Sequence, residues 1–462
     1  MAAKHSSPEF SLSALWRNEN IRAVLYQILV LLLFIAGGVI IFRNTFANLE
    51  TRGISSGFKF LNNEAGFLIS EALPVPLLEG PLLLFLAAVG AGLLGVVVLK
   101  RYQTRRGERI GDRSPLVWLS FLLVLGLPGA VLFFWGHDLR MEAYSESSPY
   151  RMALLVGLLN TLKVSFIGCL LATFLGLIIG LGRLSSNWLV SQLAGAYVEV
   201  IRNIPLLLQL YFWYQAVLQA MPDVQDSVAL GNVFIMNNRG VYVPNPTAGE
   251  GFRLLMLSLV IAGLGIYARA RSVRRIQEAT GIRGSVMGPS LAMLIGFPAL
   301  AVALGGQPFA VTYPELEGFN FIGGLVLTPE YAALLLGLVI YTAAFIAEIV
   351  RSGIQAVSKG QREAAQAMGL RKGLVMRLVI LPQALRVIIP PLTSQYLNLT
   401  KNSSLGIAIG YPELVSVGGT TLNQSGQAIE IIAITMAVYL TFSLLISLFM
   451  NWYNAKIKLV ER

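Results

Sequence analysis

Cysteine, histidine and aspartate are scarce in this 462-residue chain. The single cysteine, Cys169, can form no intramolecular disulfide and cannot supply a thiolate cluster for a metal. The two histidines, His5 and His137, stand alone, and the four aspartates lie in predicted loops, at positions 112, 138, 223 and 226. An integral membrane enzyme needs paired carboxylates, a metal cluster or an activated nucleophile, so the sequence argues against that class and predicts no metal site.

A phosphate-binding loop is also missing. Such a loop needs a Gly-rich backbone followed by Lys and then Ser or Thr, and no lysine of this chain precedes either residue. We therefore expect no cofactor on this chain, and any nucleotide that drives it must bind to another subunit. The net charge is +11, but Lys and Arg gather in short loops between apolar runs. This pattern indicates membrane topology rather than nucleic-acid binding.

Long hydrophobic runs dominate what remains. Hydrophobic residues make up 55% of the chain and charged residues 13%, which is far from the composition of soluble proteins. We predict an all-α polytopic membrane protein with about ten spans in the lipid bilayer. The basic loops alternate consistently only if both termini are cytoplasmic. The predicted spans are 23–42, 81–99, 115–135, 152–181, 202–217, 254–268, 288–304, 331–350, 385–409 and 429–452.

The order of these runs suggests two parts. Residues 1–150 form a predicted N-terminal extension with three spans, and 23–42 is too long for a signal-peptide core, so we interpret it as a retained anchor. Residues 151–462 form the predicted transport domain, with a two-helix insertion at 221–330. Within the insertion we expect a polar outer loop over 221–253 and a compact loop or small hairpin over 305–329. Glycines in the run 152–181 predict close helix packing.

One cytoplasmic stretch, residues 359–382, reads KGQREAAQAMGLRKGLVMRLVILP. Residues 361–368 predict a short helix with Glu363 in the first turn, where the helix dipole favours an anion. Small side chains on one face suit this helix to a partner's groove, and Pro382 predicts a bend before the next span. A plain basic surface helix is the alternative. The residues that we expect to contact a partner are Gly360, Glu363, Ala364, Ala365, Met368 and Gly369.

The spacing of Glu363-Ala364-Ala365, Gly369 and the run 379–382 resembles the EAA loop of permease subunits in ABC importers. The resemblance extends from Gly157 to Arg462 through YTAAFIAEIVRSGI, VILPQALRVIIPPLTSQYLNLTKNSSL, YPELV and MNWYN. It points to the polar amino-acid permease family, and most closely to Q-type subunits of general L-amino-acid permeases. The first three spans and the insertion depart from the minimal five-helix core of that family.

The resemblance implies a type I ABC importer permease core in the bacterial inner membrane. It implies that 359–382 is the coupling loop, which seats in a cleft of a separate ATP-binding cassette ATPase carrying ATP and Mg²⁺. The other implied partners are a second, related permease subunit and a periplasmic amino-acid-binding protein, with L-amino acids as substrate. A self-contained secondary transporter remains the alternative, because the Pro390-Pro391 break allows an interrupted helix with an ion site.

Polar residues inside a predicted span are candidates for a substrate pathway, because they are costly in lipid. Lys401, Asn402, Ser403 and Ser404 interrupt the run 385–409, and Gln209 is a weaker candidate in 202–217. A hydrogen-bonded packing cluster is the alternative for all five. The pairs Glu199–Arg202 and Glu348–Arg351 have i, i+3 spacing, and we interpret them as ion pairs at the inner membrane boundary.

Overall fold

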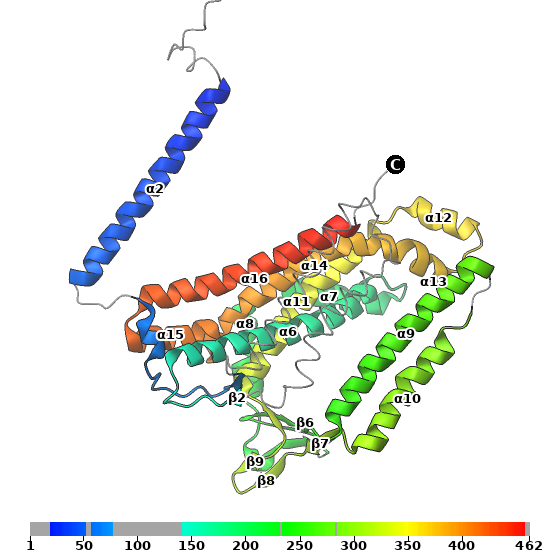
Figure 1. Cartoon of the computed structure of the whole chain (residues 1–462), viewed down its shortest axis with the longest axis horizontal. Coiled ribbons are helices and arrows are strands. Elements are labelled where there is room, and N and C mark those ends of the chain that lie inside the picture. Colours follow the sequence, from blue (N-terminus) through cyan, green and yellow to red (C-terminus); the bar gives the residue numbers. More distant parts are fainter. Residues whose placement is uncertain (1–18, 52–56, 77–140, 232, 282–283, 458–462) are drawn as a thin grey trace, which may run out of the picture.

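The computed structural model describes residues 19–51, 57–76, 141–231, 233–281 and 284–457. Long helices lie side by side, and a small group of strands projects from one side of them (Figure 1). The described helices include seven of spanning length and hydropathy, or eight with one bent pair. This confirms a helical polytopic membrane protein. The predicted spans 81–99 and 115–135 lie outside the described residues, so the total of ten stays a prediction.

Four helices form the centre of the bundle. α6 (Tyr150–Arg183) and α11 (Pro329–Gln355) pack along most of their length, and α14 (Leu381–Asn402) and α16 (Ala428–Ile457) lie beside them. The predicted close packing at glycine is confirmed. A Cβ added at Gly176 would lie only 2.7 Å from Cβ of Ile346 on α11. Small residues therefore let the two backbones approach, and α11 is the most buried of the candidate spans.

The span predicted at 202–217 is bent. α7 (Trp188–Asn203) and α8 (Leu206–Tyr211), which continues as the π-helical η4 (Phe212–Leu218), meet at 105°. Pro205 stands at the start of α8, where its fixed φ suits helix entry and its missing N–H leaves no intrahelical bond unmade. The proline therefore begins the second helix.

The insertion contains more strand than the sequence predicts. Around the helical hairpin of α9 (Phe252–Thr280) and α10 (Met287–Gly305), short strands pair in three antiparallel groups. The polar outer segment expected over 221–253 is not a plain loop, because it contains strands that pair partly with residues about 60 to 90 positions later. The hairpin expected within 305–329 is confirmed. The groups are β10-β5-β4-β3 (Leu325–Leu327, Gly240–Val243, Phe234–Asn237, Val228–Leu230), β6-β7 (Asn245–Ala248, Phe309–Thr312) and β8-β9 (Glu315–Glu317, Asn320–Ile322).

The N-terminal helix α2 (Glu19–Thr51) stands apart from the bundle (Figure 1). Its apolar side chains are exposed. The segment that follows it does pack against the bundle. In residues 57–76, η1 (Phe58–Asn62) and the strand β1 (Val75–Pro76), which pairs with β2 (Met141–Glu142), contact α6. Phe60 and Tyr150 bring their ring centroids within 6.0 Å. This segment therefore covers the amino-terminal end of α6.

Candidate functional site

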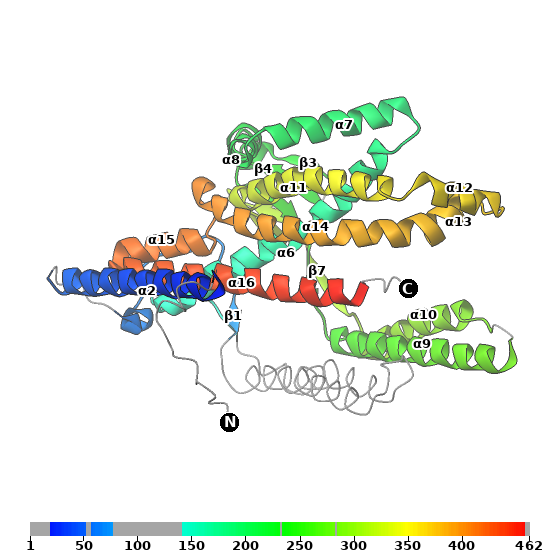
Figure 2. The same cartoon turned by 90° about the horizontal axis from the view of Figure 1, so that it is seen from above.

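The predicted docking helix exists as α12 (Lys359–Ala367), which follows α11 after three residues. Figure 2 shows α12 and α13 (Lys372–Val375) at the end of the bundle, beyond α11 and α14. Every side chain of α12 is exposed except that of Ala365, which is 8% exposed and packs into the main hydrophobic core. Met368, just after the helix, is 83% exposed. One small residue therefore packs this helix into the core, and Gln361 also accepts a hydrogen bond from Gln383 of α14.

The end of α12 has a fixed geometry that depends on Gly369. The N–H of Gly369 donates to the carbonyl oxygen of Gln366 at 2.9 Å, and that of Leu370 donates to the carbonyl oxygen of Ala365 at 3.2 Å. This pair of bonds is the Schellman motif, which requires a left-handed residue at the first position beyond the cap. Gly369 has φ +79°, a conformation that costs other L-residues energy. The glycine therefore shapes the exposed loop.

Two details of the coupling segment differ from the prediction. α12 begins at Lys359, so Gly360 lies inside the helix, and Glu363 lies beyond the first turn, where the dipole interaction has weakened. Lys372 to Ile409 also runs as one candidate span through Pro382, so the bend predicted there does not separate two helices. A π-helical turn, η6 (Met376–Ile380), precedes the proline. The wider turn accommodates the ring without ending the helix.

The four consecutive polar candidates lie where α14 changes to the 3₁₀ helix η7 (Ser403–Ile409). Ser403 is buried and donates its hydroxyl to the carbonyl oxygen of Thr400 at 2.7 Å, while Ser404 donates to that of Lys401 at 2.8 Å. Lys401 is exposed, and within the described residues its ammonium forms no ion pair. Asn402 is partly exposed. The two hydroxyls therefore support the local backbone, and Lys401 presents an unpaired charge at the surface of the span.

Gln209 has a different role from residues 401–404. Its buried side-chain nitrogen donates to the carbonyl oxygens of Ile201 at 2.9 Å and Ile204 at 3.0 Å. These carbonyls lie at the end of α7, where the helix leaves its last acceptors unpaired. The amide therefore caps the break between α7 and α8, and its own oxygen is buried with no partner in the described structure.

A cluster of charges joins α6 to α11 at the end nearest α12. Nε of Arg351 lies 3.1 Å from Oε2 of Glu348, which confirms the predicted pair, and Arg183 of α6 also pairs with Glu348. The predicted pair between Glu199 and Arg202 does not form in the described structure, because the Arg202 guanidinium lies 4.9 Å from the Phe345 ring centroid.

A polar cavity of about 290 Å³ opens beside this cluster. It lies between α6, α7 and α11, and its walls include Arg183, Glu199, Arg351 and Gln355. Arg183 is the last residue of α6. In the sequence, only the position of Arg183 at the end of a long apolar run indicated that it could join this charge cluster.

A second polar cluster lies at the opposite end of α6, and the sequence did not reveal it. Glu71, from the segment 57–76, places Oε1 3.4 Å from Nζ of Lys163, which lies 4.2 Å from the ring centroid of Tyr331. Asn160 donates to the carbonyl oxygen of Glu71 at 2.7 Å. Burial raises the pKa of Glu71, and the nearby Lys163 opposes that shift. The segment 57–76 is therefore tied to α6 by a charge pair and a hydrogen bond.

Glu413 is fully buried beside this cluster. Its carboxylate accepts hydrogen bonds from the N–H groups of Val415 at 2.8 Å and Ser416 at 2.7 Å, and so caps α15 (Leu414–Ser425). Burial raises the pKa of Glu413 to about 7, although the two backbone donors act in the opposite direction. A carboxyl group at the edge of α15 therefore titrates near neutral pH.

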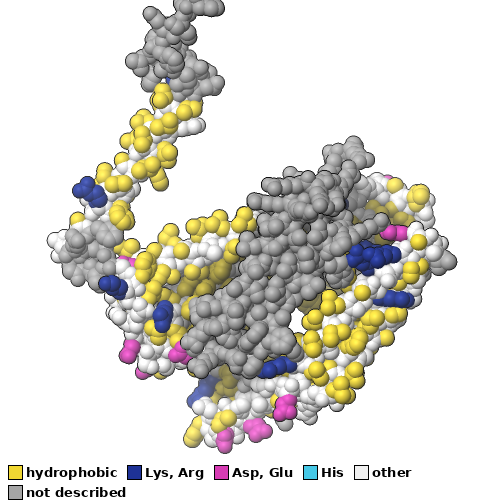
Figure 3. Space-filling view, viewed as in Figure 1, with side chains coloured by type: hydrophobic (Ala, Val, Ile, Leu, Met, Phe, Trp, Pro, Cys, Tyr) yellow, Lys and Arg dark blue, Asp and Glu magenta, His cyan; other side chains and the backbone are white. Residues whose placement is uncertain are grey.

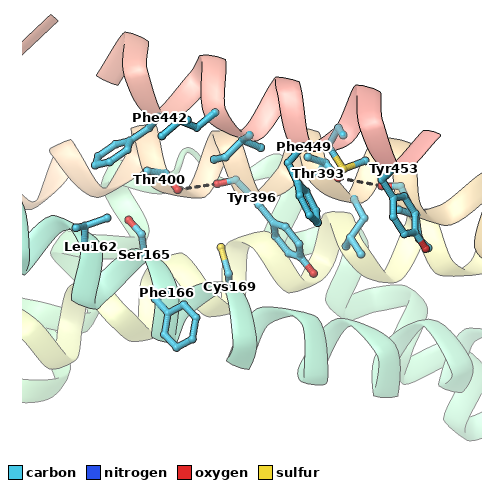
Figure 4. Close-up of a pocket in the computed structure, with 15 residues that line it drawn as sticks. Leu162, Ser165, Phe166, Cys169, Thr393, Tyr396, Thr400, Phe442, Phe449 and Tyr453 are labelled. Carbon is cyan, nitrogen blue, oxygen red and sulfur yellow. Dashed lines mark hydrogen bonds between the residues drawn. The ribbon is translucent and has the colours of Figure 1, made fainter. Parts of the chain in front are cut away.

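An apolar cavity of about 590 Å³ lies between α6, α14 and α16 (Figure 4). Two of its polar groups are hydrogen-bonded nearby: Thr393 donates to Sδ of Met450 at 2.7 Å, and Thr400 donates to the carbonyl oxygen of Tyr396 at 2.9 Å. The buried hydroxyl of Ser165, which also lines the cavity, has no hydrogen-bond partner among the described residues. None of the five predicted pathway residues lines this cavity. The sequence pattern identified polar groups in a span but did not locate this cavity between the helices.

The sequence pattern of one known family matches residues 172–459, which is more than half of the chain. The family is described as binding-protein-dependent transport system inner membrane component. The chain belongs to this family. The match includes α12, the cluster 401–404 and Gln209, whereas Glu71 and Lys163 precede it.

Curated members of the binding-protein-dependent transport family support the assignment. The chain is 53% identical over 319 residues to the general L-amino acid transport system permease protein AapQ of Rhizobium johnstonii, covering 69% of this chain and 80% of the relative. It is 42% identical to the putative amino-acid ABC transporter permease protein YhdX of Escherichia coli, with 100% of both chains covered. It is 38% identical to the glutamate/glutamine/aspartate/asparagine transport system permease protein BztB of Rhodobacter capsulatus, covering 98% and 97%.

Proposed function

We propose that this chain is the permease subunit of an ATP-driven importer that moves L-amino acids from a periplasmic binding protein across the inner membrane. The names of three relatives that cover most of this chain support the substrate class and the transport role. ATP hydrolysis takes place on a separate ATP-binding cassette subunit with its Mg²⁺, so this chain is not itself an enzyme. A second, related permease subunit completes the pathway.

The observation that carries the proposal is the exposed helix α12. It lies between two spans, packs into the core through Ala365, accepts a hydrogen bond from Gln383 at Gln361, and ends in a fixed glycine turn beside the exposed Met368. A free helix face with one apolar side chain at its end suits a groove on a partner. The ATPase contacts in this proposal are Gly360, Glu363, Ala364, Ala365, Met368 and Gly369.

The remaining assignments follow from the same function. Residues 151–462 form the transport domain, with the insertion at 221–330, and residues 1–150 are an added segment. Lys401, Asn402, Ser403 and Ser404 contribute to the substrate pathway, supported by the exposed charge of Lys401, which forms no ion pair with a described residue. Gln209 shapes the pathway indirectly by holding the break between α7 and α8. A secondary transporter explains neither α12 nor the family.

A matched pair of methionines tests the coupling surface. Met368→Ser removes an exposed apolar side chain beside α12, and Met287→Ser makes the same change at the start of α10, where the methionine is 76% exposed. We expect Met368→Ser to lower the amount of ATPase recovered with the purified permease about tenfold, since exposed anchors dominate binding energy. Met287→Ser should recover normal amounts. Equal recovery with both variants would show that α12 does not dock the ATPase.

A transport assay tests the class of protein. The purified complex in proteoliposomes should accumulate labelled L-amino acids only when binding protein is present outside and ATP is supplied on the ATPase side. A proton or sodium gradient without ATP should drive no uptake. Uptake by this chain alone on an ion gradient would establish a secondary transporter and refute the proposal.

A further inference from the structure

The β8–β9 hairpin in the insertion is held in one position. Glu317 pairs with Asn320 across a two-residue turn, in which Gly318 has φ +64°. Phe321 of β9 packs against Tyr242 of β5, with ring centroids 4.9 Å apart. A side chain from outside the hairpin also holds its turn, because Arg239 donates to the carbonyl oxygen of Phe319 at 3.3 Å and to Oδ1 of Asn320. The hairpin is therefore fixed to the adjoining sheet.

The outward face of this hairpin carries both charged and apolar side chains. Side chains alternate between the two faces of a strand, so Glu315 and Glu317 share one face with Ile322, the cross-strand partner of Glu315. Both carboxylates are exposed, and neither forms an ion pair with a residue that the structure describes. Ile322 is 57% exposed, and Phe319 at the tip is 76% exposed. A rigid, exposed aromatic residue beside unpaired charges is typical of a binding anchor.

The charge of the surrounding region contrasts with that of the chain. The strand region of the insertion, residues 222–251 and 306–328, carries five acidic residues and one basic residue, Arg239, whereas the whole chain has a net charge of +11. Figure 3 shows Asp and Glu side chains at the edge of the molecule where Figure 1 places β8 and β9. Membrane topology explains why Lys and Arg are rare on the outer side, but it does not explain paired carboxylates on one exposed face.

The position of the region identifies the side of the membrane. β10 ends at Leu327, Thr328 caps α11 by accepting from the N–H of Tyr331 at 3.2 Å, and α11 then runs to Gln355, three residues before α12. The strands therefore lie at the end of α11 opposite the cytoplasmic coupling segment. A surface there faces the compartment from which an importer receives its substrate.

We propose that the β8–β9 hairpin is a docking site for the periplasmic binding protein, with Phe319 entering an apolar pocket and Glu315 and Glu317 contacting a basic rim on that protein. This inference rests on the proposed function. Anionic lipid headgroups would be repelled by the carboxylates, and a second copy of this chain would bring like charges together. A soluble partner with basic residues around an apolar pocket fits both features.

Charge reversal on the hairpin tests the docking site in the intact complex. The double variant Glu315→Lys/Glu317→Lys should raise the binding-protein concentration that half-maximally stimulates ATPase activity by about tenfold at low salt, because opposite charges accelerate association. Phe319→Ser should raise it about tenfold at any salt concentration. Glu250→Lys is the control, since Glu250 is an exposed carboxylate of the same region that lies just before α9. Glu250→Lys should change the half-maximally stimulating concentration of binding protein by less than about twofold.

The basal ATPase rate and the yield of assembled complex should be unchanged in all variants. A hairpin that serves only the fold would lower both, and this result would overturn the docking site. Unchanged stimulation in the double variant and in Phe319→Ser would also overturn it. If the unaltered complex itself shows no stimulation, the proposed function fails as well, which separates the two conclusions.

Cross-linking between purified components identifies the occupant. Cys169→Ser removes the single native cysteine, so Phe319→Cys in that background carries one site for a thiol-reactive photo-cross-linker. An adduct with the binding protein is expected, and it should disappear when unlabelled binding protein is in excess. An adduct with the second permease subunit alone would assign the hairpin to the contact between permeases and refute the proposal.

Discussion

The backbone N–H of Leu370 donates to the carbonyl oxygen of Ala365 at 3.2 Å, across the turn that ends α12. Both side chains also pack into the same hydrophobic core. A hydrophobic contact between these two positions commonly accompanies the Schellman motif. The bond and the contact together join an otherwise exposed helix to the bundle, so the direction of α12 depends on the turn between them.

Gly369→Ala should weaken the attachment of the ATPase. At φ +79°, an alanine costs about 1–2 kcal/mol, which loosens the turn and the position of α12. The control is Gly373→Ala in α13, where φ is not positive and an added Cβ has no neighbour within 4 Å. Affinity of the purified permease for its ATPase, measured by titration, should fall for the first variant alone. Equal affinities would show that the turn does not set the docking geometry.

Lys401→Met should impair uptake without loss of assembly. The substitution keeps a long side chain and removes an exposed charge that forms no ion pair with described residues. Loss of a charge-assisted hydrogen bond to an amino-acid zwitterion costs about 1.5–3 kcal/mol, or roughly 10- to 150-fold in affinity. Uptake in proteoliposomes is measured per intact complex. Normal uptake per complex, with a lower yield of complex, would assign Lys401 to packing instead.

Gly180→Ala should destabilise the contact between α6 and α11. The new Cβ would lie 2.8 Å from the carbonyl oxygen of Ala347 and 2.9 Å from Cβ of Val350. Forcing extra volume into a packed interface costs about 1–3 kcal/mol. Gly195→Ala in α7 is the control, because nothing lies within 4 Å of its added Cβ. Thermal unfolding in detergent should show a lower midpoint only for Gly180→Ala, and a shift of equal size in both would point to a general helix effect.

Stability should fall as the pH rises from about 5 to 8. The pKa of Glu413 is about 7 in the folded chain against 4.5 for an ordinary Glu. Between these values the unfolded chain has released a proton that the folded chain still holds. The free energy of unfolding therefore decreases with pH, by at most about 1.4 kcal/mol per pH unit for this group.

Glu413→Gln provides the control for the pH effect. The amide keeps an acceptor for the N–H groups that begin α15 but does not titrate. The thermal midpoints at pH 5 and pH 8 should therefore lie closer together in the variant. Some difference should persist, because burial also raises the pKa of Glu71. An unchanged difference would mean that Glu413 is not the titrating group.

The helical part of the fold was predictable because its signals are local. Apolar runs of spanning length, the short helix around Glu363 and the glycine after it can each be recognised within some 20 residues. The continuity of the helix through Pro382 was not predictable for the same reason. A proline ring disfavours a regular helix, but the π turn at 376–380 that admits it has no comparable sequence signal.

The strands and the outer polar cluster were not predictable from local patterns. Val243 pairs with Leu325, and strands of three or four residues carry too little alternation to be recognised. In the sequence, Lys163 is a single charge inside a long apolar run, and only the fold brings Glu71 beside it from 92 positions away. Likewise, nothing near Gln209 in the sequence indicates that its amide caps the preceding helix. The sequence identifies polar candidate residues, and the structure shows which of them already form hydrogen bonds or ion pairs within the fold.

The continuity of α11 has a mechanical consequence. Its 27 residues span about 40 Å without an internal proline, and the sheet strand β10 and the helix α12 adjoin its two ends. A rod of that length turns small tilts into large displacements: about 10° of rotation moves one end by about 7 Å relative to the other. Because a hydrogen-bonded helix resists stretching, the two ends must move in concert. A reorientation of α11 would therefore displace β10 on one side of the membrane and α12 on the other at the same time.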